Sequence, residues 1–369
     1  MTFLWAVILF GLLIFFHELG HFVLAKLVGV KVLKFSLGFG PKLISKKIGD
    51  TEYLISAIPL GGYVKPLGEE IGEEISEEDR MRAFNFQTVW KRMAIVVAGP
   101  VFNLVLAYLI FTFFLGFSQP IAIPDLDSIT TTIESVSEDS PAEKAGIKMD
   151  DKIVAINGKS VMDWNEMADI LSKHPGKDLM LQVRRGEEVL NLVVVPEPTK
   201  IKDENGKEVL IGRIGVSKKL NATIIQSDSI FEAPFKGVQA VYEWCVLTLK
   251  VVVKLFTGSL SAKQVGGPIL IVDAAAKAAS IGLFTYFNFI AIISINLAIL
   301  NLLPVPVLDG GHIMFLSVEA LRRKPLSDKI MGVANKIGMT LLLMLILFVF
   351  YNDTMRIVVP WVQKSLISN

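Results

Sequence analysis

Four apolar stretches, each about as long as a lipid bilayer is thick, constrain the fold of this chain more than any other feature. A helix needs roughly 20 mostly apolar residues to cross the hydrocarbon core. Thr2–Val28, Met93–Phe117 and Ile281–Leu303 meet that requirement. Ile337–Tyr351 is shorter, and we expect the apolar run Ile357–Trp361 to extend it. The sequence therefore predicts a polytopic α-helical membrane protein with four transmembrane helices.

The composition agrees with this interpretation and excludes other classes of protein. Hydrophobic residues make up 52% of the 369 residues and charged residues 20%, which excludes a disordered chain, a collagen and a soluble enzyme. The 37 basic and 36 acidic residues nearly cancel, so no overall positive charge attracts nucleic acid. Cys245 is the single cysteine and cannot form an internal disulfide.

Gly237–Thr257 is a further long helix candidate, but its charges argue against a span. Glu243, Lys250 and Lys254 are spaced so that they share one helical face. A helix of this kind lies in the membrane interface with its charges toward water. We therefore expect an amphipathic interfacial helix at about 230–257.

Basic residues beside the spans predict which way the spans run. Lys26, Lys31 and Lys34 follow the first span, so the positive-inside rule places its C-terminal end in the cytoplasm. The inserted region, about 118–280, then lies on the extracytoplasmic side, because long domains cross largely regardless of charge. No small-residue cleavage site follows the first apolar run, so we expect no cleavable secretory signal.

The inserted region has the pattern of a small α+β domain. Asn157-Gly158 marks a turn, and Ser140 and Asp163 are expected helix caps. The segment 140–158 resembles a PDZ domain of the circularly permuted kind found in bacterial proteases, although Asp150-Asp151 stands where many PDZ domains have Gly-Asp. We assign residues 127–198 to this domain. The predicted elements are strands at Thr132–Val136, Lys152–Ile156, Leu179–Arg184 and Val189–Val195, and helices at Ser140–Ala145 and Trp164–Ser172.

The PDZ resemblance implies a partner, because PDZ domains bind an extended peptide as an added strand. The partner would be a peptide or a substrate C-terminus; the alternative is a domain that only limits access. Residues 199–280 follow, with one more strand pair at Lys207–Ser217 and a hairpin turn at 203–206 before the amphipathic helix.

His17-Glu18-Leu19-Gly20-His21 is the strongest local signal for chemistry. On a helix, positions i and i+4 share a face, so both imidazoles can bind one metal ion while Glu18 lies beside it as a base. Ionisable side chains within an apolar span cost about 2.5–3.5 kcal/mol each on insertion scales, so they need partners and mark function. The alternative interpretation is three side chains that extend to the cytoplasmic interface.

A catalytic zinc of this type needs a third protein ligand and an open position for water. Asp309 lies on a Pro- and Gly-rich break after the third span, and irregular backbone at that depth must be buried in protein or line a watery cavity. His312, three residues later, is a rival ligand, and chemistry alone does not separate the two. One ion can join Asp309 to the first span only if both spans run in the same direction. Four spans satisfy this condition, and a crossing Gly237–Thr257 would violate it.

Together these features resemble the site-2 protease family of intramembrane zinc metalloproteases, and within it the bacterial regulator-of-sigma-E protease branch. The resemblance implies a Zn²⁺ cofactor with His17, His21 and Asp309 as ligands and Glu18 as the catalytic base. Familiar members carry two tandem PDZ domains, whereas this chain has room for one, so filtering of substrates by two domains is not carried over. Further matching motifs are Gly38-Phe39-Gly40, Pro59-Leu60-Gly61-Gly62-Tyr63, Ala83-Phe84-Asn85, Ala98-Gly99-Pro100-Val101-Phe102-Asn103, Gly266-Gly267-Pro268 and Asn301–His312.

Three amides within or beside the apolar spans are candidates for binding substrate or stabilising the oxyanion: Asn103, Asn296 and Asn301. Hydrogen bonding between helices is the alternative, and is at least as strong a candidate for Asn103. A membrane-associated β-hairpin at about 35–65 follows the first span. As the resemblance implies, it would present an edge to an unwound substrate.

The resemblance implies a protease of the bacterial cytoplasmic (inner) membrane, and the predicted topology places its PDZ domain on the extracytoplasmic side. Its expected substrates are single-pass membrane proteins, such as anti-sigma factors already cleaved on the outer side, or signal-peptide remnants. An alternative is a non-enzymatic membrane-anchored PDZ scaffold with a structural zinc site. The intact Glu18 favours the protease, because a structural site needs no base.

Overall fold

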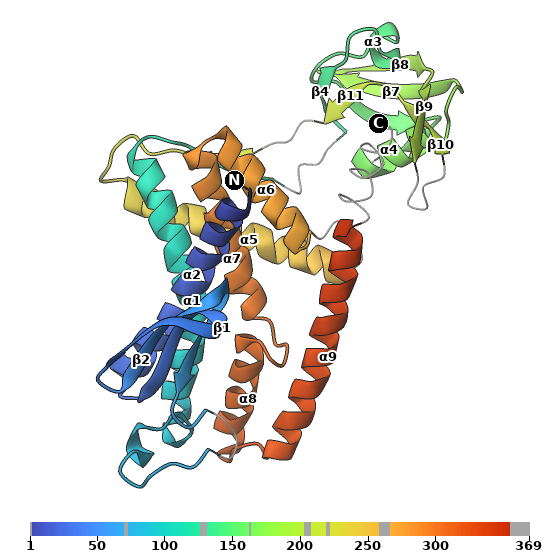
Figure 1. The fold of residues 1–369 in the computed structure, drawn as a ribbon. Helices are drawn as coiled ribbons and strands as arrows, with labels where there is room; N and C mark the ends of the chain where they lie inside the picture. The colour runs from blue at the N-terminus through green and yellow to red at the C-terminus, as the bar shows by residue number, and fades with distance from the viewer. Residues whose placement is uncertain are drawn as a thin grey trace, which may run out of the picture. The chain divides into compact units, whose positions relative to one another are not determined.

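The structure is a computed structural model that describes residues 2–69, 73–125, 131–161, 164–202, 208–218, 222–257 and 266–354. The chain divides into two compact units. Unit 1 comprises Met1–Ile121 and Ile225–Asn369, and unit 2 comprises Ala122–Ile224. Figure 1 shows unit 1 as helices with one long hairpin and unit 2 as a small body of strands with two short helices.

Unit 1 contains the apolar helices that the sequence predicts. They are α1 (Thr2–Leu27), α2 (Val89–Gly116), α7 (Leu283–Asn301) and α9 (Asp328–Asp353). Among the described residues, these four helices are long and apolar enough to cross a membrane. Both α1 and α7 pack against α2, whereas α9 packs against α6.

The fourth apolar helix differs from the prediction at its N-terminal end. Helix α9 begins at Asp328, nine residues before the expected start at Ile337, and so gains its length on that side. The run Ile357–Trp361 lies outside the described residues. Only 11% of the most apolar window of α9 is buried, so most of its surface faces outward.

Three further helices complete unit 1: α5 (Ala233–Phe256), α6 (Pro268–Ile281) and α8 (Asp309–Arg322). Helix α5 lies where the amphipathic helix was expected, and it is not among the four candidate spans. Helices α6 and α8 were not predicted, because each has 14 residues and begins at a Gly- or Pro-rich segment that reads as a loop. Two 3₁₀ turns, Arg80–Arg82 and Phe84–Phe86, precede α2.

The predicted hairpin consists of β1 (Val32–Ile48) and β2 (Thr51–Pro66). Both strands fold back, so that Lys34 lies opposite both Glu52 and Lys65. The first half of β1 therefore runs between the two halves of β2. Phe35 attaches this sheet to α1, with its ring centroid 5.0 Å from that of Phe22. Figure 1 shows the sheet beside the lower part of α1 and α2.

Unit 2 is built around a four-stranded sheet in the order β6-β5-β7-β8. The expected strands and helices all form within one or two residues of their predicted ends, and the Ser140 hydroxyl caps α3 by accepting from the Glu143 N–H. Asp163 lies outside the described residues. The elements up to residue 194 are β3 (Ile121–Pro124), β4 (Ile133–Val136), α3 (Pro141–Lys144), β5 (Lys152–Ile156), β6 (Lys159–Ser160), α4 (Trp164–Ser172), β7 (Leu179–Arg185) and β8 (Glu188–Val194).

The strands after residue 196 also belong to unit 2. They are β9 (Glu197–Lys202), β10 (Glu208–Arg213), β11 (Val216–Lys218) and β12 (Ala222–Ile225). The prediction that 207–217 forms one strand pair is wrong, because β10 pairs with β9 and β11 pairs with β4. A turn at Gly215, with φ of 76°, separates the two strands and sends them to different partners.

The Asp150-Asp151 departure from Gly-Asp has a backbone consequence. Asp150 adopts φ of 65°, in the left-handed region where glycine is favoured and aspartate is tolerated. Asp151 is fully buried and bonded to Arg185 through both carboxylate oxygens, at 2.8 and 2.7 Å. The chain thus keeps the turn that glycine usually makes, at the cost of a less favoured φ.

Candidate metal centre

Helix α1 presents His17 and His21 on one face, as the four-residue spacing predicts. Their Nε2 atoms lie 3.2 Å apart, and the side chains are 13% and 16% exposed. Two imidazole nitrogens directed at one point are suited to bind a single ion.

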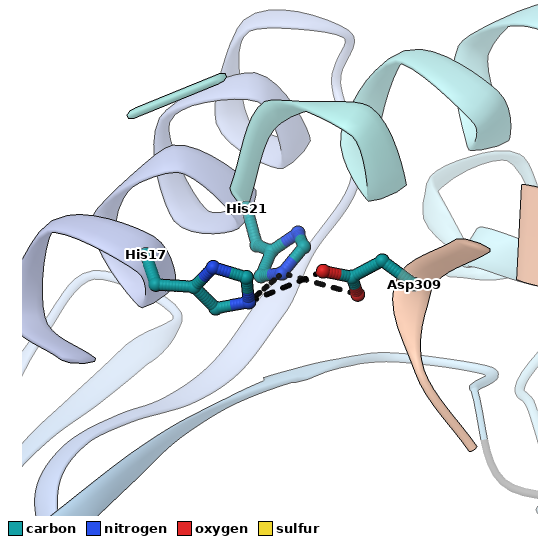
Figure 2. A group of neighbouring side chains, drawn as sticks. All are labelled: His17, His21 and Asp309. Carbon is teal, nitrogen blue, oxygen red and sulfur yellow. Dashed lines mark hydrogen bonds and ion pairs between the residues drawn. The ribbon is translucent and has the colours of Figure 1, made fainter. Parts of the chain in front are cut away.

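Asp309 brings a carboxylate to the same point from a distant part of the chain. Its Oδ2 atom lies 3.2 Å from His17 Nε2, and its Oδ1 atom lies 3.6 Å from His21 Nε2 (Figure 2). The ligand atoms of the three residues all lie within 4.8 Å of one another. The structure thus brings together the residues that the sequence analysis selected as metal ligands.

The two residues after Asp309 must be glycines, because the backbone of the turn before Asp309 passes too close to them for a side chain. A Cβ on Gly310 would lie 2.1 Å from the Leu303 carbonyl oxygen, and a Cβ on Gly311 would lie 2.4 Å from that of Val305. Val307 adopts φ of 84°, which is strained for a β-branched residue. The turn between α7 and α8 therefore folds tightly, and Asp309 becomes the first residue of α8.

The three side chains fit a zinc ion by their chemistry. Asp309 Oδ2 is buried and has no hydrogen-bond partner among the described residues. A buried carboxylate oxygen without a partner is costly, and a cation between it and the imidazoles would satisfy it. Two histidines and one carboxylate also leave a coordination position open, as catalytic zinc sites require.

His312 is not part of the cluster that the structure forms. The group of side chains able to hold an ion consists of His17, His21 and Asp309 among the described residues. His312 follows Asp309 by nearly one turn of α8, and it is exposed. The geometry therefore favours Asp309 over the rival ligand that chemistry left open.

Helix α2 shapes the other side of the centre. A Cβ on Gly99 would lie 2.3 Å from His21 Nε2 and 2.8 Å from His17 Cε1, so only glycine leaves room for both rings. Pro100 lacks the N–H that would bond the Val96 carbonyl and interrupts the helical ladder here. The adjacent Ile95 carbonyl accepts a hydrogen bond from His21 Nδ1 at 2.8 Å.

Glu18 lies between the histidines in sequence and beside the hairpin in space. Its carboxylate accepts a hydrogen bond from the backbone N–H of Val64 on β2. A Cβ on Gly62 would lie 3.4 Å from Glu18 Cγ, so the second half of β2 runs directly past this side chain. Within the hairpin expected at about 35–65, residues 62–64 are therefore the part of β2 that lies next to Glu18.

The three candidate amides have different surroundings. Asn103 Nδ2 lies 3.2 Å from His17 Nδ1, the ring nitrogen that is not directed at the ion site. Asn296 Oδ1 accepts a hydrogen bond from Thr248 of α5 at 2.8 Å, which is a contact between helices. Asn301 is the last residue of α7 and precedes the turn that leads to Asp309.

Two contributions to this centre were not predicted. Ala98-Gly99-Pro100 was expected only as a motif that matches the family, although Gly99 provides the space for the imidazoles. The pairing of Arg92 on α2 with Glu319 on α8 was not expected at all. Gly99 and Pro100 within an apolar span were a local signal for the close approach of α2. No local signal predicts the Arg92–Glu319 pair, because its two residues lie far apart in the sequence.

The fold and the site together define a class of protein. In this class, long apolar helices carry a centre of two histidines and one carboxylate, and a glutamate lies next to it. The model of peptidase family M50 matches residues 5–345, and the chain belongs to this family. The resemblance to site-2 proteases is thereby confirmed, and the chain is a member of a metalloprotease family with the apolar helices of a multi-pass membrane protein.

Three relatives match along nearly their whole length, and each is named "Putative zinc metalloprotease". The protein of Clostridium acetobutylicum is 39% identical, over 94% of this chain and 96% of its own. That of Rhizobium meliloti is 36% identical over 94% of both chains, and that of Neisseria meningitidis is 31% identical over 97% and 99%.

Among solved structures, a PDZ domain of an SdrC-like protein from Listeria monocytogenes is similar to part of the chain. It covers 26% of this chain and 92% of its own, with 18% identity and a TM-score of 0.20.

Proposed function

We propose that this protein is an intramembrane zinc metalloprotease that hydrolyses peptide bonds of single-pass membrane proteins. The observation that carries the proposal is the convergence of His17, His21 and Asp309 next to Glu18. A structural zinc site has no use for a neighbouring base, so the position of Glu18 favours catalysis over a scaffold.

His17, His21 and Asp309 would hold the ion, and Glu18 would act on water and substrate. A bound zinc ion supplies a Lewis acid for the scissile carbonyl and lowers the pKa of water to about 7. Glu18 takes the water proton and passes it to the leaving amine. The Val64 N–H holds the Glu18 carboxylate in place for both transfers.

The hairpin supports a way to hold an unwound substrate. A helical substrate hides its peptide bonds, so it must become extended before cleavage. The second half of β2 pairs with β1 on one side, and among the described residues no strand pairs with its other side. A substrate that adds there as a strand would pass Glu18 beside Gly62 and Val64.

Unit 2 would select or admit substrates on the extracytoplasmic side of the bacterial cytoplasmic membrane. A groove runs between α4 and β10–β11, lined by apolar residues such as Trp164, Met167 and Leu171. Peptides bind PDZ domains as an added strand, so a peptide or a substrate C-terminus is the expected partner. Suitable substrates are anti-sigma factors already cleaved outside and signal-peptide remnants.

The test is cleavage of a model single-pass substrate in vesicles that contain either wild-type protein or Glu18→Gln, with bound zinc measured in both. We expect equal zinc in the two proteins and a loss of cleavage of about 10²- to 10⁴-fold in the variant. Equal cleavage by both proteins would exclude this mechanism. Bound zinc without cleavage in either, together with peptide binding by unit 2, would favour the non-enzymatic scaffold.

A further inference from the structure

The Asn103 side chain meets the ring nitrogen of His17 that is turned away from the ion site. The amide lies 3.2 Å from His17 Nδ1, whereas His17 Nε2 lies 3.2 Å from both His21 Nε2 and Asp309 Oδ2. Asn103 is fully buried. Its backbone is held from the other side by Ser294 of α7, whose hydroxyl donates to the Asn103 carbonyl at 2.8 Å.

This contact determines which ring nitrogen of His17, Nδ1 or Nε2, carries the hydrogen. A neutral imidazole has one N–H, and only its other nitrogen can bind a metal. Because Nε2 of His17 is directed at His21 and Asp309, a His17 able to bind an ion must carry its hydrogen on Nδ1. That hydrogen needs an acceptor, and the acceptor atom of an amide is its oxygen.

A half turn of the Asn103 amide brings that oxygen to His17. The oxygen and nitrogen of an amide have nearly the same shape, and their assignment follows from the surrounding hydrogen bonds. In its present position Asn103 Oδ1 is buried, and no group in the described part of the chain bonds it. No hydrogen bond to the oxygen therefore opposes the turned orientation.

His21 shows the same arrangement with an unambiguous partner. Its Nδ1 atom lies 2.8 Å from the Ile95 carbonyl oxygen, which can only accept. His21 therefore carries its hydrogen on Nδ1 and presents Nε2 to the centre. Partners of this kind orient metal-binding histidines, and their loss typically weakens metal binding by about 10- to 100-fold.

We propose that Asn103 is a positioning residue whose amide oxygen accepts the Nδ1 hydrogen of His17 and so prepares Nε2 to bind the ion. Asn103 does for His17 what the Ile95 carbonyl does for His21, and it acts on the centre only through His17. The proposal rests on the metal centre of the proposed function but not on proteolysis, so it is tested on zinc binding and on the imidazole itself.

The first experiment measures zinc affinity of the full-length protein in detergent by competition with a chromogenic chelator. We expect Asn103→Leu to bind zinc about 10- to 100-fold more weakly. Asn103→Asp keeps an acceptor and should remain within about threefold of wild type. The matched control is Asn296→Leu, which removes a partly buried amide that bonds Thr248 rather than a histidine and should leave zinc affinity unchanged.

The second experiment reads the hydrogen directly by ¹⁵N NMR of histidine-labelled, zinc-free protein at about pH 9, well above the ordinary imidazole pKa of about 6.5. The chain has only 4 histidines, so a His17→Gln spectrum identifies the His17 signals. We expect the Nδ1–H form in wild type and Asn103→Asp, and a mixture of both forms in Asn103→Leu.

Either of two results would overturn the proposal: His17 with its hydrogen on Nε2 in the wild type, or Asn103→Leu with unchanged zinc affinity. The wild-type spectrum tests the proposal even if Asn103→Leu does not fold. A failure of the proposed protease function would appear differently, as zinc binding and the Nδ1–H form without cleavage.

Discussion

Arg92 on α2 and Glu319 on α8 form a two-point ion pair across 227 residues of sequence. One contact, from Nη1 to Oε2, measures 3.2 Å, and Nη2 also bonds Oε1. The two side chains are only 13% and 15% exposed. Because α2 packs against the helix that carries both histidines and α8 begins with Asp309, this pair joins the two halves of the candidate centre.

Breaking the Arg92–Glu319 pair should loosen the metal centre. Glu319→Gln leaves a mostly buried guanidinium without its partner, and we expect a loss of about 3 kcal/mol in stability and roughly tenfold weaker zinc binding. The exchange Arg92→Glu/Glu319→Arg restores the pair and should recover part of both. Thermal unfolding in detergent and chelator competition measure the effects; a Glu319→Gln protein with wild-type zinc affinity would show that the pair does not position Asp309.

A methyl group at residue 99 should abolish metal binding. The Cβ of Gly99→Ala would lie 2.3 Å from His21 Nε2, so the imidazole must leave its position. The matched control is Gly11→Ala on α1, where a Cβ meets nothing within 4 Å. Zinc content after dialysis distinguishes the two: near zero for Gly99→Ala and unchanged for Gly11→Ala. A Gly99→Ala protein with full zinc would contradict the close approach of α2 to the imidazoles.

Asp353 should protect the start of α6. This fully buried carboxylate at the end of α9 accepts from the backbone N–H groups of Gly267 and Leu270, at 2.9 and 3.0 Å. Such caps contribute about 1–2 kcal/mol. We expect Asp353→Asn to speed hydrogen exchange of those two amides by about 5- to 30-fold. Asp273→Asn, which breaks an exposed pair with Lys277 on the same helix, should not.

Acid should destabilise unit 2 through Asp151. Burial raises the pKa of the Asp151 carboxyl, but hydrogen bonds from Arg185 and from the Lys148 N–H outweigh it and hold the pKa below its usual range. The pKa of Asp151 is thus lower in the folded state than in the unfolded chain, where it is about 3.9. The contribution of Asp151 to the free energy of unfolding is therefore complete above that pH, and it is lost as the pH falls through the folded-state pKa. The charged form is therefore the one that stabilises the fold.

Hydrogen exchange of the β5 and β7 amides in the full-length protein, corrected for intrinsic rates, measures this effect between about pH 7 and pH 3. We expect opening to become easier below about pH 4 in wild type. Asp151→Asn should be less stable at neutral pH and nearly insensitive to acid over this range. The control Asp169→Asn, in an exposed pair with Lys173, should follow the wild type.

Patterns that depend on neighbouring residues were predictable. The length of the apolar runs predicted α1, α2 and α7, and strand alternation with turn residues predicted β5, β7 and β8 in unit 2. The i, i+4 spacing of His17 and His21 predicted that both imidazoles share one face, because helical geometry places them there without any tertiary contact. These features follow from local backbone geometry and from the transfer of apolar side chains out of water.

Other features arise only when distant segments meet. Chemistry left Asp309 and His312 as equal candidates, and the tight turn after α7 decided that Asp309 joins the histidines. Which neighbour each amide bonds, a histidine for Asn103 and a helix partner for Asn296, likewise depends on packing. The sequence by itself determined the helices, the inserted domain and the kinds of ligand. The tertiary structure decided which of these residues contact one another. Hydrogen bonds and steric limits between residues far apart in the chain exist only once α1, α2, α7 and α8 have packed.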